Sequence, residues 1–106
     1  DTSFKEVPEK ISITKNFQPL LRRKNYFKIL LEEKPDFVIG DVFSLDIALP
    51  LYLRLKDPRF KKIKVIQKIQ PHTPQWVIDF LTSDDLKEIA FIINDISELP
   101  ALIAAD

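Results

Sequence analysis

The chain has 106 residues, 45% of them hydrophobic, with 16 basic and 16 acidic side chains and therefore a formal net charge of zero. This length and apolar content fit one globular domain, and the balanced charge disfavours nucleic acid as a partner, because neutralising phosphates requires an excess of Lys and Arg. The absence of cysteine excludes disulfides and thiolate chemistry, and no apolar run approaches the roughly 20 residues of a membrane-spanning helix, which disfavours a membrane protein.

The amino-terminal segment 1–6 does not resemble a signal peptide, so we expect a soluble, cytoplasmic protein. The first residue is Asp1 rather than methionine, which indicates either processing or a chain that is part of a longer polypeptide. No internal repeat or flexible linker divides the sequence, so residues 1–106 are predicted to form a single domain.

Short apolar runs alternate with longer segments of helical periodicity. Apolar and polar residues alternate over 10–14, which predicts a half-buried or edge strand. The apolar spacing over 16–33 predicts a helix that Pro35 ends. The next segment, 36–40, is a short apolar strand of the kind found in sheets covered on both faces.

The middle of the chain continues this alternation. A helix is predicted to start near Ser44 and to end at 57–58, and a third strand is predicted over 62–67. Thr73 is predicted to cap a further helix over 74–81, with a proline at its first position.

A fourth strand, 88–93, reads as fully buried, and Asp95 or Ser97 is predicted to cap a short terminal helix over 98–104. Strands that alternate with helices in this way predict an α/β fold, with a parallel sheet and right-handed crossovers.

The segment 40–46 contains the residues best placed for chemistry. Gly40 is the only glycine in the chain and is predicted to lie where the backbone needs unusual freedom. Asp41 follows the end of a buried strand, where open α/β sheets bind ligands, and Asp46 lies about one helical turn later. Such a pair of carboxylates can share a hard cation such as Mg²⁺; alternatively, Asp41 is a turn residue and Asp46 a first-turn helix acid.

The apolar strand 37–39 followed by Gly40-Asp41, with Asp46 five residues later, resembles the fourth motif of the haloacid dehalogenase superfamily of phosphohydrolases. Segment 90–103 resembles the family's carboxyl-terminal strand and helix, and the two matches with the order of elements span roughly residues 10–103. The resemblance implies a three-layer, Rossmann-like parallel sheet with helices on both faces. It also implies that Asp41 and Asp46 hold the Mg²⁺ that binds the phosphate of a small phosphorylated substrate.

The resemblance further implies a phosphate-binding lysine that follows a strand and opens the helix before the Gly-Asp motif. Lys15 occupies this position and is the predicted catalytic lysine, and Lys24, which lies well inside the predicted helix, is the alternative. A lysine there would neutralise phosphate as a compact point charge. The competing interpretation for either residue is a solvated surface lysine.

The chain departs from the family at its catalytic nucleophile, because no strand ending in Asp-x-Asp is present in 1–106. The resemblance therefore implies the carboxyl-terminal part of a core domain, which is incomplete and inactive alone. The remainder would come from a missing amino-terminal part or from another chain. Two alternatives stay open: a non-catalytic α/β binding module, and a receiver-like or nucleotide-binding domain, which the lack of a Gly-rich loop disfavours.

Two further features carry less weight. His72 is the only histidine and lies in a proline-bracketed loop after a strand. We expect a plain loop histidine, and the alternative is a residue at the rim of the same crevice. Trp76 and Phe80 are spaced as neighbours on one helix face, which predicts core packing.

Overall fold

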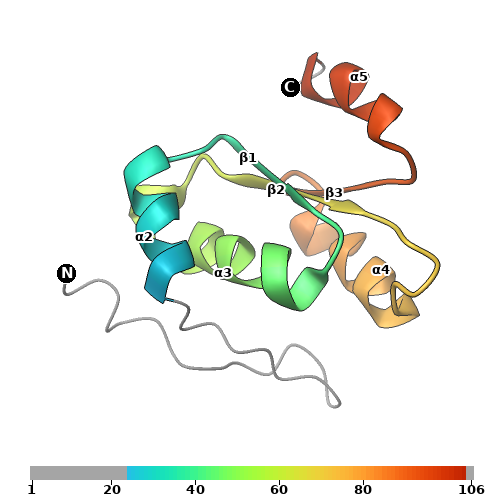
Figure 1. Ribbon diagram of the computed structural model, residues 1–106, viewed down its shortest axis with the longest axis horizontal. Helices are drawn as coiled ribbons and strands as arrows, with labels where there is room; N and C mark the ends of the chain where they lie inside the picture. The colour runs from blue at the N-terminus through green and yellow to red at the C-terminus, as the bar shows by residue number, and fades with distance from the viewer. Residues whose placement is uncertain (1–23, 105–106) are drawn as a thin grey trace.

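The computed structural model describes residues 24–104. Three strands form one parallel sheet in the order β1-β2-β3 (Figure 1). They are β1 (Phe37–Gly40), β2 (Lys64–Lys68) and β3 (Ala90–Ile93), each within two residues of its predicted bounds. The α/β class is therefore confirmed. The predicted strand at 10–14 lies outside the described residues.

Helices connect and flank these strands. They are α2 (Lys24–Glu33), α3 (Ala48–Lys56), α4 (Gln75–Leu81) and α5 (Leu99–Ala104). Figure 1 shows α3 and α4 below the strands in that view and α5 above them. Because α3 links β1 to β2 and α4 links β2 to β3, each parallel pair is joined by a helical crossover. Within residues 24–104, no helix is long and apolar enough to cross a membrane.

The main core lies between the sheet and its crossover helices. Val38, Val65 and Ala90 are in register across the three strands, and each is at most 8% exposed. They belong to one buried cluster that includes residues of both helices, among them Leu51, Leu53, Val77 and Leu81. Burial of this apolar face is the main stabilising contribution, at about 25 cal/mol per Å² removed from water.

The neighbouring row faces the opposite side of the sheet, because side chains alternate along a strand. Ile39, Ile66 and Phe91 are in register there. Ile66 on the central strand is completely buried, whereas Ile39 is 40% exposed. The strand β1, which is at one edge of the sheet formed by residues 24–104, is therefore less covered on this face than its wholly apolar sequence predicts.

The helix starts show how local side chains set the boundaries. Of the two predicted caps of the carboxyl-terminal segment, Asp95 rather than Ser97 is the N-cap, and it accepts a 2.8 Å bond from the Ser97 N–H. The helix α4 begins one residue later than predicted, because Pro74 rather than Thr73 is its N-cap. Thr73 instead closes the preceding turn: its hydroxyl accepts a bond from the Gln70 N–H at 2.8 Å.

Candidate functional site

Gly40 ends β1, and its role is steric. Gly40 does not have a positive φ, so the prediction that this position needs unusual backbone freedom is wrong. A Cβ placed on Gly40 would lie 2.7 Å from both Cγ and Oδ2 of Asp46 and closer still to its Cβ. These separations are shorter than non-bonded atoms tolerate, so only glycine permits the Asp46 side chain to pack directly against the end of the strand.

Asp46 lies in a π-helical turn, Phe43–Ile47, that leads into α3. Its Oδ2 accepts bonds from the backbone N–H groups of Asp41 at 3.2 Å and Val42 at 3.0 Å. The Tyr26 hydroxyl donates to the Asp46 carbonyl at 2.6 Å. The side chain of Asp46 thus folds back to fix the turn that carries Asp41.

Asp41 is exposed at the carboxyl end of the sheet, and its N–H, its carbonyl and one carboxylate oxygen form hydrogen bonds. The Asp41 N–H donates to Oδ2 of Asp46. The buried amide of Gln67 donates to the Asp41 carbonyl at 3.0 Å, and Gln70 Nε2 donates to Oδ2 of Asp41 at 3.3 Å. The two glutamines come from the end of β2 and the loop after it. The exposed carboxylate of Asp41 is thus bonded by the loop after β2, and its backbone is held by β2 and by the turn after β1.

The sequence interpretation missed both glutamines. For Gln67 the available signal was a polar residue directly after the apolar pair Val65-Ile66, because a buried side-chain amide is normally hydrogen-bonded. Gln67 is completely buried, and its Nε2 also donates to the Lys68 carbonyl at 3.1 Å. Its Oε1 has no hydrogen-bond partner in the structure described for residues 24–104.

A cavity of about 210 Å³ lies beside Asp41, between the turn after β1, the end of β2 and the start of α4. Its walls include Gln67, His72 and Trp76. His72 lies in the loop before α4, and it lines this cavity together with Asp41, which is the less favoured of its two interpretations from the sequence. Trp76 and Phe80 both meet the buried Phe43 ring edge-on, with centroids 5.5 and 6.1 Å away, which confirms their predicted packing role.

The acidic side chains that follow β3, at the same end of the sheet, accept hydrogen bonds from nearby backbone N–H groups. Glu98 Oε2 accepts the N–H groups of Asn94 and Asp95, both at 2.7 Å. The Ser97 backbone N–H holds the pKa of Asp95 below its ordinary value. Residues 24–104 contain no group of three or more His, Asp or Glu side chains arranged to hold a metal. A cation here would rely on one or two carboxylates plus water, which is the mode Mg²⁺ favours.

Asp41 and Asp46 are therefore the two predicted site residues that the structure brings together, on a single turn. Asp46 stabilises that turn, because its Oδ2 accepts two backbone N–H groups. Asp41 has its side chain exposed at the carboxyl end of the sheet. Lys15 lies outside the described residues, and for Lys24 only the backbone position at the start of α2 is described.

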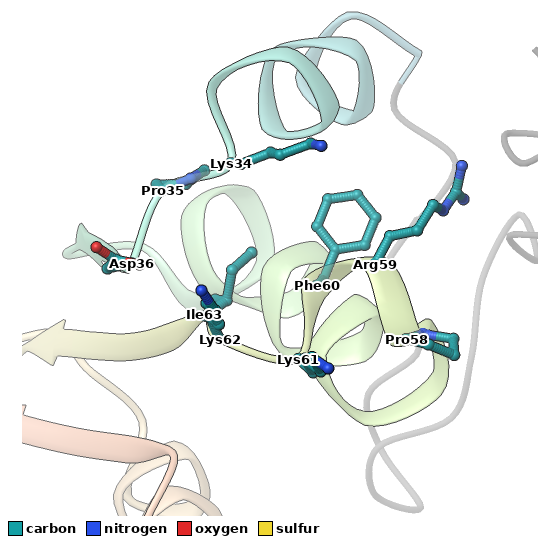
Figure 2. A pocket seen from close by; sticks show the side chains of 9 residues that line it. All are labelled: Lys34, Pro35, Asp36, Pro58, Arg59, Phe60, Lys61, Lys62 and Ile63. Atoms are coloured by element: carbon teal, nitrogen blue, oxygen red, sulfur yellow. The ribbon is translucent and has the colours of Figure 1, made fainter.

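A second cavity, of about 250 Å³, lies at the opposite end of the sheet, where the chain enters β1 and β2 (Figure 2). Figure 2 shows Lys34 and Arg59 on either side of the Phe60 ring. Arg59 is paired with Asp57, with 2.6 Å between Nη2 and Oδ2. This cavity is separate from the Asp41 turn and carries none of the predicted site residues.

Comparison of the chain with known protein families, curated proteins and solved structures finds no match.

Proposed function

We propose that the chain is the carboxyl-terminal part of a Mg²⁺-dependent, haloacid-dehalogenase-like phosphohydrolase that acts on a small phosphate ester. The observation that supports this most is the fixation of Asp41. Its carboxylate lies just past the carboxyl end of a parallel strand, where α/β sheets bind ligands. Four hydrogen bonds fix the residue and its turn: two are accepted by Asp46 of the same turn, and two are donated by Gln67 and Gln70.

Asp41 and Asp46 would hold the cation, directly or through water, as a magnesium site with few protein ligands requires. When bound, Mg²⁺ would neutralise charge on the phosphoryl oxygens. Asp46 would keep the turn in place, because its Oδ2 accepts the N–H groups of Asp41 and Val42. Lys15, or alternatively Lys24, would hold the substrate phosphate. The nucleophilic Asp would come from outside this chain, which alone would be inactive.

The proposed architecture is the three-layer one, with helices on both faces of the sheet. Its support is the second face of the strands, where Ile39, Ile66 and Phe91 form an apolar row. An apolar row on each face is typical of a parallel sheet covered on both sides. Further strands beyond β1 would complete the sheet in the parent protein.

A non-catalytic binding module is the second candidate. The bonding of Asp46 favours it, because a carboxylate that already accepts two backbone N–H groups has a structural reason to be there without a metal. This candidate predicts that divalent cations leave the protein's stability unchanged.

Thermal unfolding with Mg²⁺ and inorganic phosphate distinguishes the two. A ligand at ten times its dissociation constant stabilises the folded state by about 1.4 kcal/mol, which raises the midpoint by roughly 6–11 °C for a domain of this size. Asp41→Asn keeps the size of the side chain and should remove the rise. Asp85→Asn, at an exposed acid before β3, should retain it.

Sodium chloride at matched ionic strength controls for general screening. If Mg²⁺ and phosphate leave the thermal unfolding midpoint of the unmutated chain unchanged, that result would count against the metal site. So would an equal rise in Asp41→Asn, because the stabilising cation would then be bound elsewhere.

A further inference from the structure

Positive charge gathers at the amino end of the sheet, although the whole chain has zero formal net charge. The segment 54–64, which ends α3 and enters β2, contains six basic residues and one acidic residue. Part of this segment lines the 250 Å³ cavity at that end, together with the chain that follows α2 (Figure 2). One acid, Asp36, lines the cavity, against four basic residues: Lys34, Arg59, Lys61 and Lys62.

The lysines come from two sides of the cavity. Figure 2 shows Lys34 on the side of α2, and Lys61 and Lys62 on the side of the chain that enters β2. All three are exposed, and none of them forms an ion pair with an acid within residues 24–104. The cavity therefore has ammonium groups on two sides whose charge no described acid pairs with.

Arg59 contributes less of its charge to the cavity, because Asp57 pairs with it. The Nε and Nη2 of Arg59 donate to the two carboxylate oxygens of Asp57, at 3.0 and 2.6 Å. Its guanidinium carbon lies 5.7 Å from the centroid of the Phe60 ring. The three lysines are thus the main source of positive charge around the cavity.

The end of α2 explains only one of these lysines. Lys34 follows that helix, where the dipole favours a cation, but its φ of 45° is the left-handed conformation that suits glycine better. Lys61 and Lys62 follow the turn Pro58–Phe60, which is too short to favour cations in this way. Cations around one cavity repel each other, so a bound anion would remove an unfavourable interaction.

We infer that this cavity binds a small dicarboxylate. One carboxylate would lie near Lys34 and the other near Lys61 and Lys62, because an anion charged at both ends is complementary to cations on two sides. The volume corresponds to about eight water molecules at roughly 30 Å³ each, enough for a chain of four to six carbon atoms. That chain would contact Pro35 and Pro58 in the cavity wall. The site lies at the opposite end of the sheet from the proposed magnesium site and does not depend on it.

Two four-carbon probes of similar size test the inference: succinate, with a carboxylate at each end, and butyrate, with one. Binding is followed in ¹H–¹⁵N spectra at low salt and without Mg²⁺, with sodium chloride added to equalise the ionic strength. We expect saturable millimolar binding of succinate, about three- to tenfold tighter than that of butyrate, as one further charge pair gives. The amide signals of residues 60–63 should shift, and those of Asp41 and Val42 should not.

Lys61→Gln combined with Lys62→Gln removes the charge on one side and should reduce the preference for succinate to less than about twofold. Lys34→Gly should also weaken succinate binding, although it relieves the left-handed backbone, so unfolding would not explain the loss. Lys28→Gln is the matched control, because Lys28 is an exposed lysine of α2 that does not line the cavity. It should retain the preference.

Equal affinity of the unmutated chain for succinate and butyrate would overturn the inference, because the cavity would then recognise no second carboxylate. Signal shifts spread over distant exposed lysines such as Lys87 would overturn it as well, since the anions would then act by general screening. So would an undiminished preference in the variant that lacks both Lys61 and Lys62.

Discussion

At the scale of single residues, the contact between Gly40 and Asp46 determines the shape of the candidate site. The glycine and both carboxylates could be identified from the sequence, because all three lie within the short segment 40–46. It does not reveal that Asp46 packs onto Gly40, since that contact depends on how the π-helical turn folds back on the strand. The polar character of Gln67 signals a hydrogen-bonding role, but its partner could not be predicted, because Asp41 is 26 residues away and meets Gln67 only in the assembled sheet.

Gly40→Ala should destabilise the fold by about 2–4 kcal/mol. The added methyl would displace Asp46, which combines overpacking with the loss of hydrogen bonds to a carboxylate. Urea unfolding measures this change. Asp46→Gly removes the Cβ that the alanine would strike, so the double variant should be less destabilised than the sum of the two single variants, by at least about 1 kcal/mol. Strict additivity would mean that Asp46 is not the reason for the glycine.

At the scale of secondary-structure elements, strands and helices were predicted well where local patterns determine them. The capping box at Asp95 is one example, because it uses neighbours three residues apart. The start of α4 was misplaced because the Thr73 hydroxyl serves the preceding turn. The π-helical turn Phe43–Ile47 was not predicted, since the bond of the Ala48 N–H to the Phe43 carbonyl leaves no sequence pattern, and neither do the bonds of Asp46 to the preceding backbone.

The end of α2 offers a direct test of backbone strain. Lys34 has φ 45°, in the left-handed region that favours glycine. Lys34→Gly should therefore stabilise the protein by about 0.5–1 kcal/mol. The same substitution at the exposed Lys28, inside α2, should destabilise it by about 1 kcal/mol. Chemical denaturation of both variants checks the opposite signs, and destabilisation by Lys34→Gly would contradict the assignment of strain.

The short turn Pro58–Phe60 depends on an ionised cap. The Arg59 side chain, bonded to Asp57, holds the pKa of that carboxyl below its ordinary value of 3.8. Because the pKa of Asp57 is lower in the folded state than in the unfolded state, its ionised carboxylate stabilises the fold above pH 3.8. This stabilisation is lost as the pH falls through the lower, folded-state pKa. Asp57→Ala should thus cost about 1 kcal/mol at pH 7.

That cost should shrink at a pH well below 3.8, where Asp57 is protonated in both states and its pairing with Arg59 is lost. Unfolding measured at the two pH values tests this. A cost that stays constant would show that the ionised carboxylate contributes no part of the effect.

At the scale of the whole molecule, the alternation of strands and helices predicts the parallel sheet, because βαβ connections permit few arrangements. The sequential order β1-β2-β3 was not predicted, since strand order depends on which edges pair in three dimensions. The candidate site follows from this order. It places the end of central β2, with Gln67, beside the turn after β1, so that Gln67 donates to the carbonyl of Asp41 while Asp46 of that turn accepts the Asp41 N–H.

Paramagnetic broadening by Mn²⁺, which substitutes for Mg²⁺ at oxygen sites, tests the proposed cation site most directly. If Asp41 and Asp46 hold the cation, the amide signals of Asp41 and Val42 should broaden at the lowest Mn²⁺ concentrations, and Asp41→Asn should abolish this selectivity. Excess Mg²⁺ should reverse it. Broadening that is uniform over the exposed acids, or that begins at Asp84 and Asp85, would contradict a cation site at the end of β1.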